Sequence, residues 1–202
     1  MNLKPFYYKN EKIIILLLVI LIIIAGYYPI DSFDQGRDSM PAFFFNFEKF
    51  IPFVPFFVIF YISMYILAGL PILYIKKIDD YRRIAVAYLI MILLHFVFYI
   101  LLPFKMDRPP IPEDGIIIFL LNLMYTIVSP YNLFPSMHVS LATFSTLIYI
   151  KYKKKYSFLM VLWLILIILS VLLIKQHQFI DVIGGLILSS LVFLLVFHKK
   201  QR

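Results

Sequence analysis

Long apolar runs alternate with short polar segments along almost the whole chain. Within a run the residues are continuously apolar rather than alternating, and Pro and Gly fall mainly at the ends, which favours helices over strands. Several runs approach or reach the roughly 20 residues that a helix needs to cross a bilayer core of about 30 Å. The pattern predicts an all-α integral membrane protein with a bundle of six transmembrane helices. The predicted spans are 12–28, 53–75, 84–103, 137–154, 157–174 and 179–197.

A further apolar segment, Ile116 to Val128, is too short to cross a bilayer. A crossing there would also place Lys151 to Lys155 on the opposite side from the other basic loops. We therefore expect an interfacial or re-entrant segment. With no linker or internal repeat, residues 1–202 are expected to form a single membrane-embedded domain.

Composition agrees with a membrane protein, because 63% of the residues are apolar and 18% are aromatic. The absence of Cys excludes a disulfide or a thiolate metal site. The net charge of +8 could suggest a nucleic-acid partner, but its placement along the chain argues for membrane topology. No nucleic acid is expected as a partner.

The charged residues predict the orientation of the helices. If the amino terminus is cytoplasmic and six helices follow, fourteen cations and three acids lie inside, giving +11. Five cations and eight acids lie outside, giving −3. This asymmetry is what the positive-inside rule expects. Both termini are then cytoplasmic, and the chain is a multi-pass protein of the cell membrane.

Residues capable of phosphate chemistry lie at the outer ends of the predicted helices. Arg108 is followed by two prolines, and its planar donors suit bidentate capture of phosphate oxygens. A cation at a helix end can also simply extend to lipid head groups. Both interpretations stay open for Arg108 when it is considered alone.

Ser136 and His138 occupy the predicted start of the fourth helix. Backbone N–H groups at a helix amino terminus favour an anion, and the Ser136 hydroxyl can add a further donor. The alternative is that Ser136 is only a helix cap and His138 an interfacial side chain.

His177 and Asp181 are four residues apart, so they share one face of a helix. The carboxylate can accept a hydrogen bond from one imidazole nitrogen and leave the other unprotonated, as a nucleophile or base requires. An acidic residue that opens an apolar helix needs a partner to offset its desolvation. A purely structural His–Asp pair is the alternative.

Together, Arg108-Pro109, Pro135-Ser136-Met137-His138 and His177 with Asp181 resemble the type 2 phosphatidic acid phosphatase superfamily over about residues 50–195. This superfamily includes lipid phosphate phosphatases and a branch of inositol phosphorylceramide synthases. Met137 stands where the second motif commonly has Gly, which is similar to the synthase-like branch.

The resemblance implies a role for each of these residues. His177 would attack phosphorus and form a phosphohistidine, oriented by Asp181, while His138 would protonate the leaving oxygen and then activate the acceptor. Arg108 and Ser136 would hold the phosphate oxygens. The family lysine six residues before Arg-Pro and the arginine of the third motif are missing, so Lys105 and Lys175 are the candidate substitutes. No metal and no cofactor are implied.

Three functions follow as hypotheses. The first is hydrolysis of a membrane lipid mono- or diphosphate at the extracytoplasmic face. The second is head-group transfer of the inositol phosphorylceramide synthase type, in which a lipid or polyol hydroxyl captures the same intermediate. The third is a non-enzymatic lipid-binding or transport protein that uses the same cations for recognition.

Overall fold

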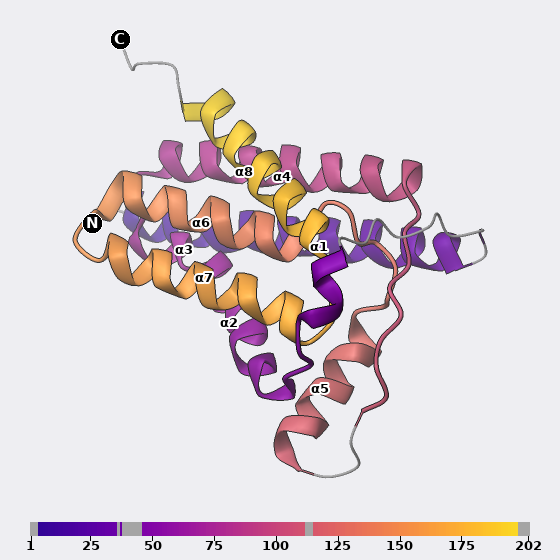
Figure 1. The fold of residues 1–202 in the computed structure, drawn as a ribbon. Coiled ribbons are helices and arrows are strands. Elements are labelled where there is room, and N and C mark those ends of the chain that lie inside the picture. The colour runs from indigo at the N-terminus through magenta and orange to yellow at the C-terminus, as the bar shows by residue number, and fades with distance from the viewer. Residues whose placement is uncertain (1–3, 36, 38–45, 112–114, 198–202) are drawn as a thin grey trace.

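The computed structural model describes residues 4–35, 37, 46–111 and 115–197, which form helices joined by loops (Figure 1). Some residues of the charge count lie outside the described part of the chain, namely Asp38, Glu113, Asp114, Lys199, Lys200 and Arg202.

Helices cover all six predicted runs, and the all-helical fold class is confirmed for the described residues. The longer helices are α1 (Lys4–Gln35), α2 (Val58–Gly69), α4 (Ile78–Leu101), α6 (Met137–Lys153), α7 (Ser157–Leu173) and α8 (Phe179–Phe197). The shorter elements are the 3-10 helices η1 (Asn46–Phe50) and η2 (Pro55–Phe57), and the α-helices α3 (Pro71–Tyr74) and α5 (Ile116–Ile127). The short segment expected at the interface is α5.

The second predicted run is divided into three consecutive elements, η2, α2 and α3. The division between α2 and α3 falls between Gly69 and Pro71. Proline has no N–H to donate to the preceding turn, and it is well tolerated in the first turn of a helix, so Pro71 begins α3.

Four helical stretches are long and apolar enough to cross a membrane by length and composition. They are Asn10–Gln35, Pro55–Tyr74, Ile78–Leu101 and Phe179–Phe197. The apolar helix α7 is shorter, with 17 residues, and α6 has the same length but carries several hydroxyl side chains. A crossing by all six helices therefore stays a prediction.

Helix α6 lies at the centre of the bundle and packs against α2, α4, α7 and α8 (Figure 1). Every residue from Met137 to Thr146 is buried, including Ser140 and Ser145. The Ser145 hydroxyl is hydrogen-bonded to Tyr88 of α4. Neighbouring helices thus cover the polar side chains of α6, as burial of hydroxyl groups in an apolar bundle requires.

The outward faces of the surrounding helices are apolar. Phe158 and Leu162 of α7, Leu195 of α8 and Val97 of α4 are all exposed. A soluble domain seldom exposes so much contiguous apolar surface, whereas hydrocarbon chains of lipids match it well. Several apolar helices with such faces make this a membrane protein.

The bundle has one end rich in cations. There Arg82 of α4 pairs with Glu11 of α1 at 2.6 Å, and the Lys151 ammonium of α6 lies 5.6 Å from the centroid of the Phe197 ring of α8. The start of α1, the end of α8 and the turn between α6 and α7 therefore lie at the same end (Figure 1). This arrangement agrees with the predicted placement of the basic loops on one side.

The orientation can be tested with single cysteines, because the chain has none of its own. We expect a membrane-impermeant maleimide added to intact cells to label Lys49→Cys, and to label Lys155→Cys only after permeabilisation. Both side chains are exposed in the protein. Labelling of Lys155→Cys from outside would reverse the predicted topology.

Gly185 allows α8 to approach the start of α6 closely. A Cβ atom at this position would lie 2.7 Å from the carbonyl oxygen of Ser136 and 3.1 Å from the Cβ of Val139. A backbone oxygen cannot move aside as a flexible side chain can. The two helix starts can therefore be this close only if residue 185 has no side chain.

Gly185→Ala should destabilise the protein by about 1–3 kcal/mol, the usual cost of overpacking, and lower its unfolding temperature in detergent. Gly69→Ala is the matched control, because a Cβ there meets nothing within 4 Å. Its unfolding temperature should be unchanged or slightly raised. Equal unfolding temperatures for the two variants would contradict the close contact.

Candidate functional site

The starts of α6 and α8 are hydrogen-bonded to each other at the end of the bundle opposite the cation-rich loops. Ser136 is the N-cap of α6, and its hydroxyl accepts from the Val139 N–H at 3.3 Å. The Ser136 N–H donates to the main-chain carbonyl of Asp181 at 3.0 Å. Ser136 therefore caps one helix with its side chain and joins a second with its backbone.

The loop after α7 directs His177 into the bundle. The N–H groups of Gln176 and His177 both donate to the carbonyl of Val171, at 2.9 and 3.1 Å, which closes the end of α7 in a tight turn. Lys175, inside this turn, has φ of +51°. The turn places the His177 side chain against the first turn of α8, where it is 3% exposed.

The Asp181 side chain is 1% exposed and lies between the backbone of Gln178 and the imidazole of His177. Its Oδ2 accepts from the Gln178 N–H at 2.8 Å and lies 3.4 Å from Nδ1 of His177. An ionised carboxylate at the start of a helix is stabilised by backbone donors and by the helix dipole. The Asp181 carboxylate therefore has a backbone donor on its own helix turn and lies beside His177.

The second imidazole completes a continuous line of polar groups. Nε2 of His177 lies 3.2 Å from Nδ1 of His138, and Nε2 of His138 lies 2.6 Å from the hydroxyl of Tyr61. The line thus runs from Asp181 through both histidines to Tyr61 of α2. The structure brings the predicted residues His138, His177 and Asp181 together. At 3.4 Å the approach of Asp181 to Nδ1 of His177 is a close contact, and this nitrogen has no hydrogen-bond partner among the described residues.

Arg108 is connected to the His177 segment through Gln176. Its guanidinium donates to the Gln176 side-chain oxygen and to the Tyr125 carbonyl, both at 2.9 Å, and also to the Val128 carbonyl. The guanidinium lies 4.1 Å from the centroid of the Tyr125 ring. Burial lowers the pKa of Arg108 from its ordinary value, and an anionic ligand would offset that cost. Its Nε has no hydrogen-bond partner within the described part of the chain.

The two candidate lysines make contacts elsewhere. Lys105 is exposed, with its ammonium 5.8 Å from the centroid of the Tyr131 ring. The Lys175 ammonium donates to the carbonyl of Ile51 at 2.6 Å, and burial lowers the pKa of this group. Each ammonium thus contacts a group other than the two imidazoles, and phosphate binding by either lysine stays a prediction.

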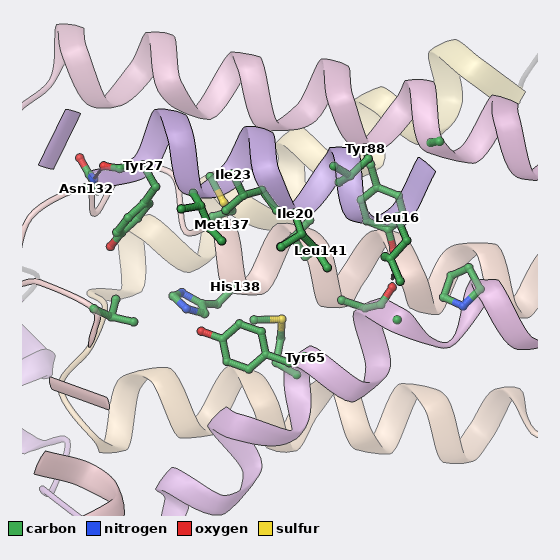
Figure 2. Close-up of a pocket in the computed structure, with 18 of the residues that line it drawn as sticks. Leu16, Ile20, Ile23, Tyr27, Tyr65, Tyr88, Asn132, Met137, His138 and Leu141 are labelled. Atoms are coloured by element: carbon green, nitrogen blue, oxygen red, sulfur yellow. Dashed lines mark hydrogen bonds between the residues drawn. The ribbon is translucent and has the colours of Figure 1, made fainter. Parts of the chain in front are cut away.

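An apolar cavity of about 560 Å³ extends from the two histidines into the bundle. Figure 2 shows His138 beside Tyr27, Tyr65 and Met137, with aliphatic side chains of α1 and α6 continuing the wall away from it. Gln176 and Asn132 are polar residues of the lining, and the Asn132 side chain donates to the Tyr27 carbonyl. Two of the lining residues, Tyr81 and Tyr99, lie near the start and the end of α4. At 1.5 Å per helical residue they are about 27 Å apart along the helix, so the cavity follows most of its length.

Two residues of the site have no signal in the sequence. Tyr61 lies in a continuously apolar run and looks like any other core aromatic residue. Gln176 is adjacent to His177, but neither its position nor its residue type predicts a contact with Arg108. Both contacts join segments far apart along the chain, between residues 61 and 138 and between residues 108 and 176.

Residues 119–195 match the model of the PAP2 superfamily. This part of the chain belongs to the PAP2 superfamily. The match includes α6, α7 and α8 with His138, His177 and Asp181, and it begins after Arg108. The resemblance to the type 2 phosphatidic acid phosphatase superfamily is confirmed. No curated protein and no solved structure is similar enough to this chain to count as a match.

Proposed function

We propose that this protein is a lipid phosphate phosphatase that hydrolyses a membrane lipid mono- or diphosphate at the extracytoplasmic face. The observation that carries the proposal is the line of Asp181, His177 and His138 at the end of a long apolar cavity. Membership of the PAP2 superfamily supports phosphatase or phosphotransferase chemistry. The extracytoplasmic side follows from the charge asymmetry of the loops.

His177 is the proposed nucleophile. With Asp181 beside Nδ1, the proton of the neutral ring stays on that nitrogen, and the lone pair of Nε2 is available for phosphorus. Attack forms the N–P bond of a phosphohistidine and breaks the bond from phosphorus to the lipid oxygen. His138, whose Nδ1 is 3.2 Å from Nε2 of His177, supplies a proton to that oxygen. Water then gives a proton back to His138 and cleaves the N–P bond, releasing inorganic phosphate.

The phosphoryl group needs donors that stabilise its charge. The amino terminus of α6 contributes backbone N–H groups and the positive end of the helix dipole, beside Ser136. Arg108 is charged, close to the His177 segment through Gln176, and has an unpartnered Nε among the described residues. These groups are the proposed phosphate-binding residues.

A lipid is the substrate that the cavity favours. Its lining is mainly aliphatic and aromatic, and it begins at the imidazoles where the phosphate would react. Each methylene transferred from water to such a surface contributes about 0.8 kcal/mol. A hydrocarbon chain attached to the phosphate would therefore occupy the cavity while its head group stays at His138 and His177.

Purified protein in detergent should release inorganic phosphate from one or more lipid mono- or diphosphates, with and without chelator. His177→Ala should lower this release more than about 1000-fold, because the intermediate can no longer form. His95→Gln is the control: His95 bonds the Met91 carbonyl and Ser140 and lies outside the proposed site. It should keep its activity. A wild-type protein that binds lipid phosphates but turns none over would favour the non-enzymatic alternative.

Head-group transfer is the second candidate function. Asn132 and Gln176 line the cavity near the imidazoles, and Oδ1 of Asn132 has no hydrogen-bond partner among the described residues. These amides can hold the hydroxyl of a lipid or polyol acceptor. An added acceptor would then yield a phosphodiester at the expense of free phosphate, whereas an unchanged phosphate yield would favour hydrolysis.

Filling the cavity should separate long-chain from short-chain substrates. Ala68 lines the cavity, so Ala68→Phe should exclude a few methylenes, costing about 2 kcal/mol or roughly 10- to 30-fold in kcat/KM for long-chain lipid phosphates. Short-chain phosphates should be little affected. Ile66→Phe adds bulk on the exposed face of the same helix and is the matched control. Equal losses for both chain lengths would argue against a chain-binding cavity.

A further inference from the structure

The hydroxyl of Tyr61 is the only part of that side chain that can form a hydrogen bond, and it lies in an apolar setting. Tyr61 has no exposed surface and packs in a cluster that includes Val58, Leu121 and Val139. A buried hydroxyl without a partner costs free energy. Tyr61 forms its hydrogen bond with Nε2 of His138 at 2.6 Å, with the two ring centroids 4.7 Å apart.

The proposed function places the ring proton of His177 on Nδ1, and this choice assigns the other protons of the resting site. With the proton of His177 on Nδ1, beside Asp181, Nε2 of His177 can only accept a hydrogen bond. Nδ1 of His138 must then donate to it, so Nε2 of His138 is unprotonated and accepts from the Tyr61 hydroxyl. Tyr61 is then the donor to His138, and its hydroxyl also interacts with the hydroxyl of Tyr65, which lines the cavity.

We propose that Tyr61 is the positioning residue of His138 and acts in both of its protonation states, an inference that rests on the proposed function. A phenolic hydroxyl both donates and accepts, so it can donate to Nε2 of the neutral ring and accept from Nε2–H of the imidazolium. A residue that only donates or only accepts would lose one of these bonds. Tyr61 thereby keeps Nδ1 of His138 directed toward the nucleophile and the leaving oxygen.

The protons balance over the two steps. His138 enters the first step as imidazolium, having taken one proton from solvent or from the phosphate, and its Nε2–H donates to Tyr61. The Nδ1 proton moves to the leaving oxygen as the N–P bond forms and the P–O bond breaks. The neutral ring keeps its proton on Nε2 and still donates to Tyr61. Nδ1 then takes a proton from the attacking water, which regenerates the imidazolium.

Nδ1 of His138 has to turn from His177 toward the substrate, because 3.2 Å between the two nitrogens leaves no space for phosphorus. The bond to Tyr61 lies on the opposite side of the imidazole and can persist through this movement. The ring then turns about a fixed Nε2 contact instead of leaving the site. Loss of the hydroxyl should impair chemistry more than substrate binding, since Tyr61 acts only through His138.

The test compares Tyr61→Phe with Tyr74→Phe. Each substitution removes one hydroxyl, but that of Tyr74 is buried without a partner among the described residues, and Tyr74 is not part of the cavity lining. For Tyr61→Phe we expect kcat to fall about 10- to 100-fold, with KM within about twofold of the wild-type value. Tyr74→Phe should retain wild-type kcat.

The pH dependence gives a readout that a purely structural role would not change. A hydrogen bond to the charged ring is stronger than one to the neutral ring, so removing Tyr61 disfavours the imidazolium more. The alkaline limb of the kcat profile should therefore move to lower pH in Tyr61→Phe. An active wild type with unchanged kcat and an unchanged profile in Tyr61→Phe would overturn the inference. Absence of phosphate release or transfer by the wild type would instead overturn the proposed function.

A second measurement requires neither turnover nor the Tyr61→Phe variant. In the wild-type protein labelled with ¹⁵N-histidine, and with His138 assigned by comparison with His138→Gln, Nε2 of His138 should show a hydrogen-bonded shift in both the neutral and the charged state. If the ¹⁵N chemical shift of Nε2 in either state is that of a nitrogen without a hydrogen bond, the inference is overturned.

Discussion

Burial of the Asp181 carboxylate is the constraint on which the rest of this site depends. Its main-chain carbonyl accepts from Ser136, its carboxylate accepts from Gln178, and the same carboxylate faces His177. An anion this deeply buried persists only if surrounding donors replace its water, so the segments that supply those donors must meet at the start of α8. The carboxylate thus ties the loop after α7 to the start of α8, and the Ser136 N–H joins α6 to the same turn through the Asp181 main-chain carbonyl.

The same requirement explains the distribution of polarity in the bundle. Side chains that face lipid are apolar, while the imidazole of His95 in α4 and the hydroxyl of Ser140 in α6 lie inside and bond each other. The same hydroxyl also donates to the main-chain carbonyl of Gly185 in α8. His95, for example, links the Met91 carbonyl of its own helix with Ser140 of α6. Polar groups in such surroundings interact more strongly than in water. In the proposed function, a phosphoryl group at His138 and His177 would meet donors already held in position.

Arg108 shows how a resting site can hold a cation ready for an anion. Its two terminal nitrogens donate to neutral oxygens of Tyr125, Val128 and Gln176, while its Nε has no partner among the described residues. Phosphate oxygens are stronger acceptors for a guanidinium than carbonyl oxygens, because the bond is assisted by opposite charges. In the proposed function a phosphate would replace these partners, and Gln176 would transmit the change to the segment that carries His177.

The sequence by itself determined the fold class, the runs that become helices and the three residues at the centre of the site. Continuous apolar runs require a helix in a bilayer, and the spacing of His177 and Asp181 places both on one face of a helix turn. These are local properties that a single segment carries. The division of the second run between Gly69 and Pro71 was also marked locally, although the run was predicted as one helix.

Only the tertiary structure decided which groups meet across the bundle. Two contacts join segments far apart along the chain, namely that of Tyr61 with His138 and that of Arg108 with Gln176. The structure also decides that Lys105 contacts Tyr131 and that Lys175 contacts the Ile51 carbonyl. The apolar cavity depends likewise on how α1, α2, α4 and α6 pack, because its lining comes from all four helices. Helix packing sets these distances, and a one-dimensional pattern of apolar residues is compatible with many packings.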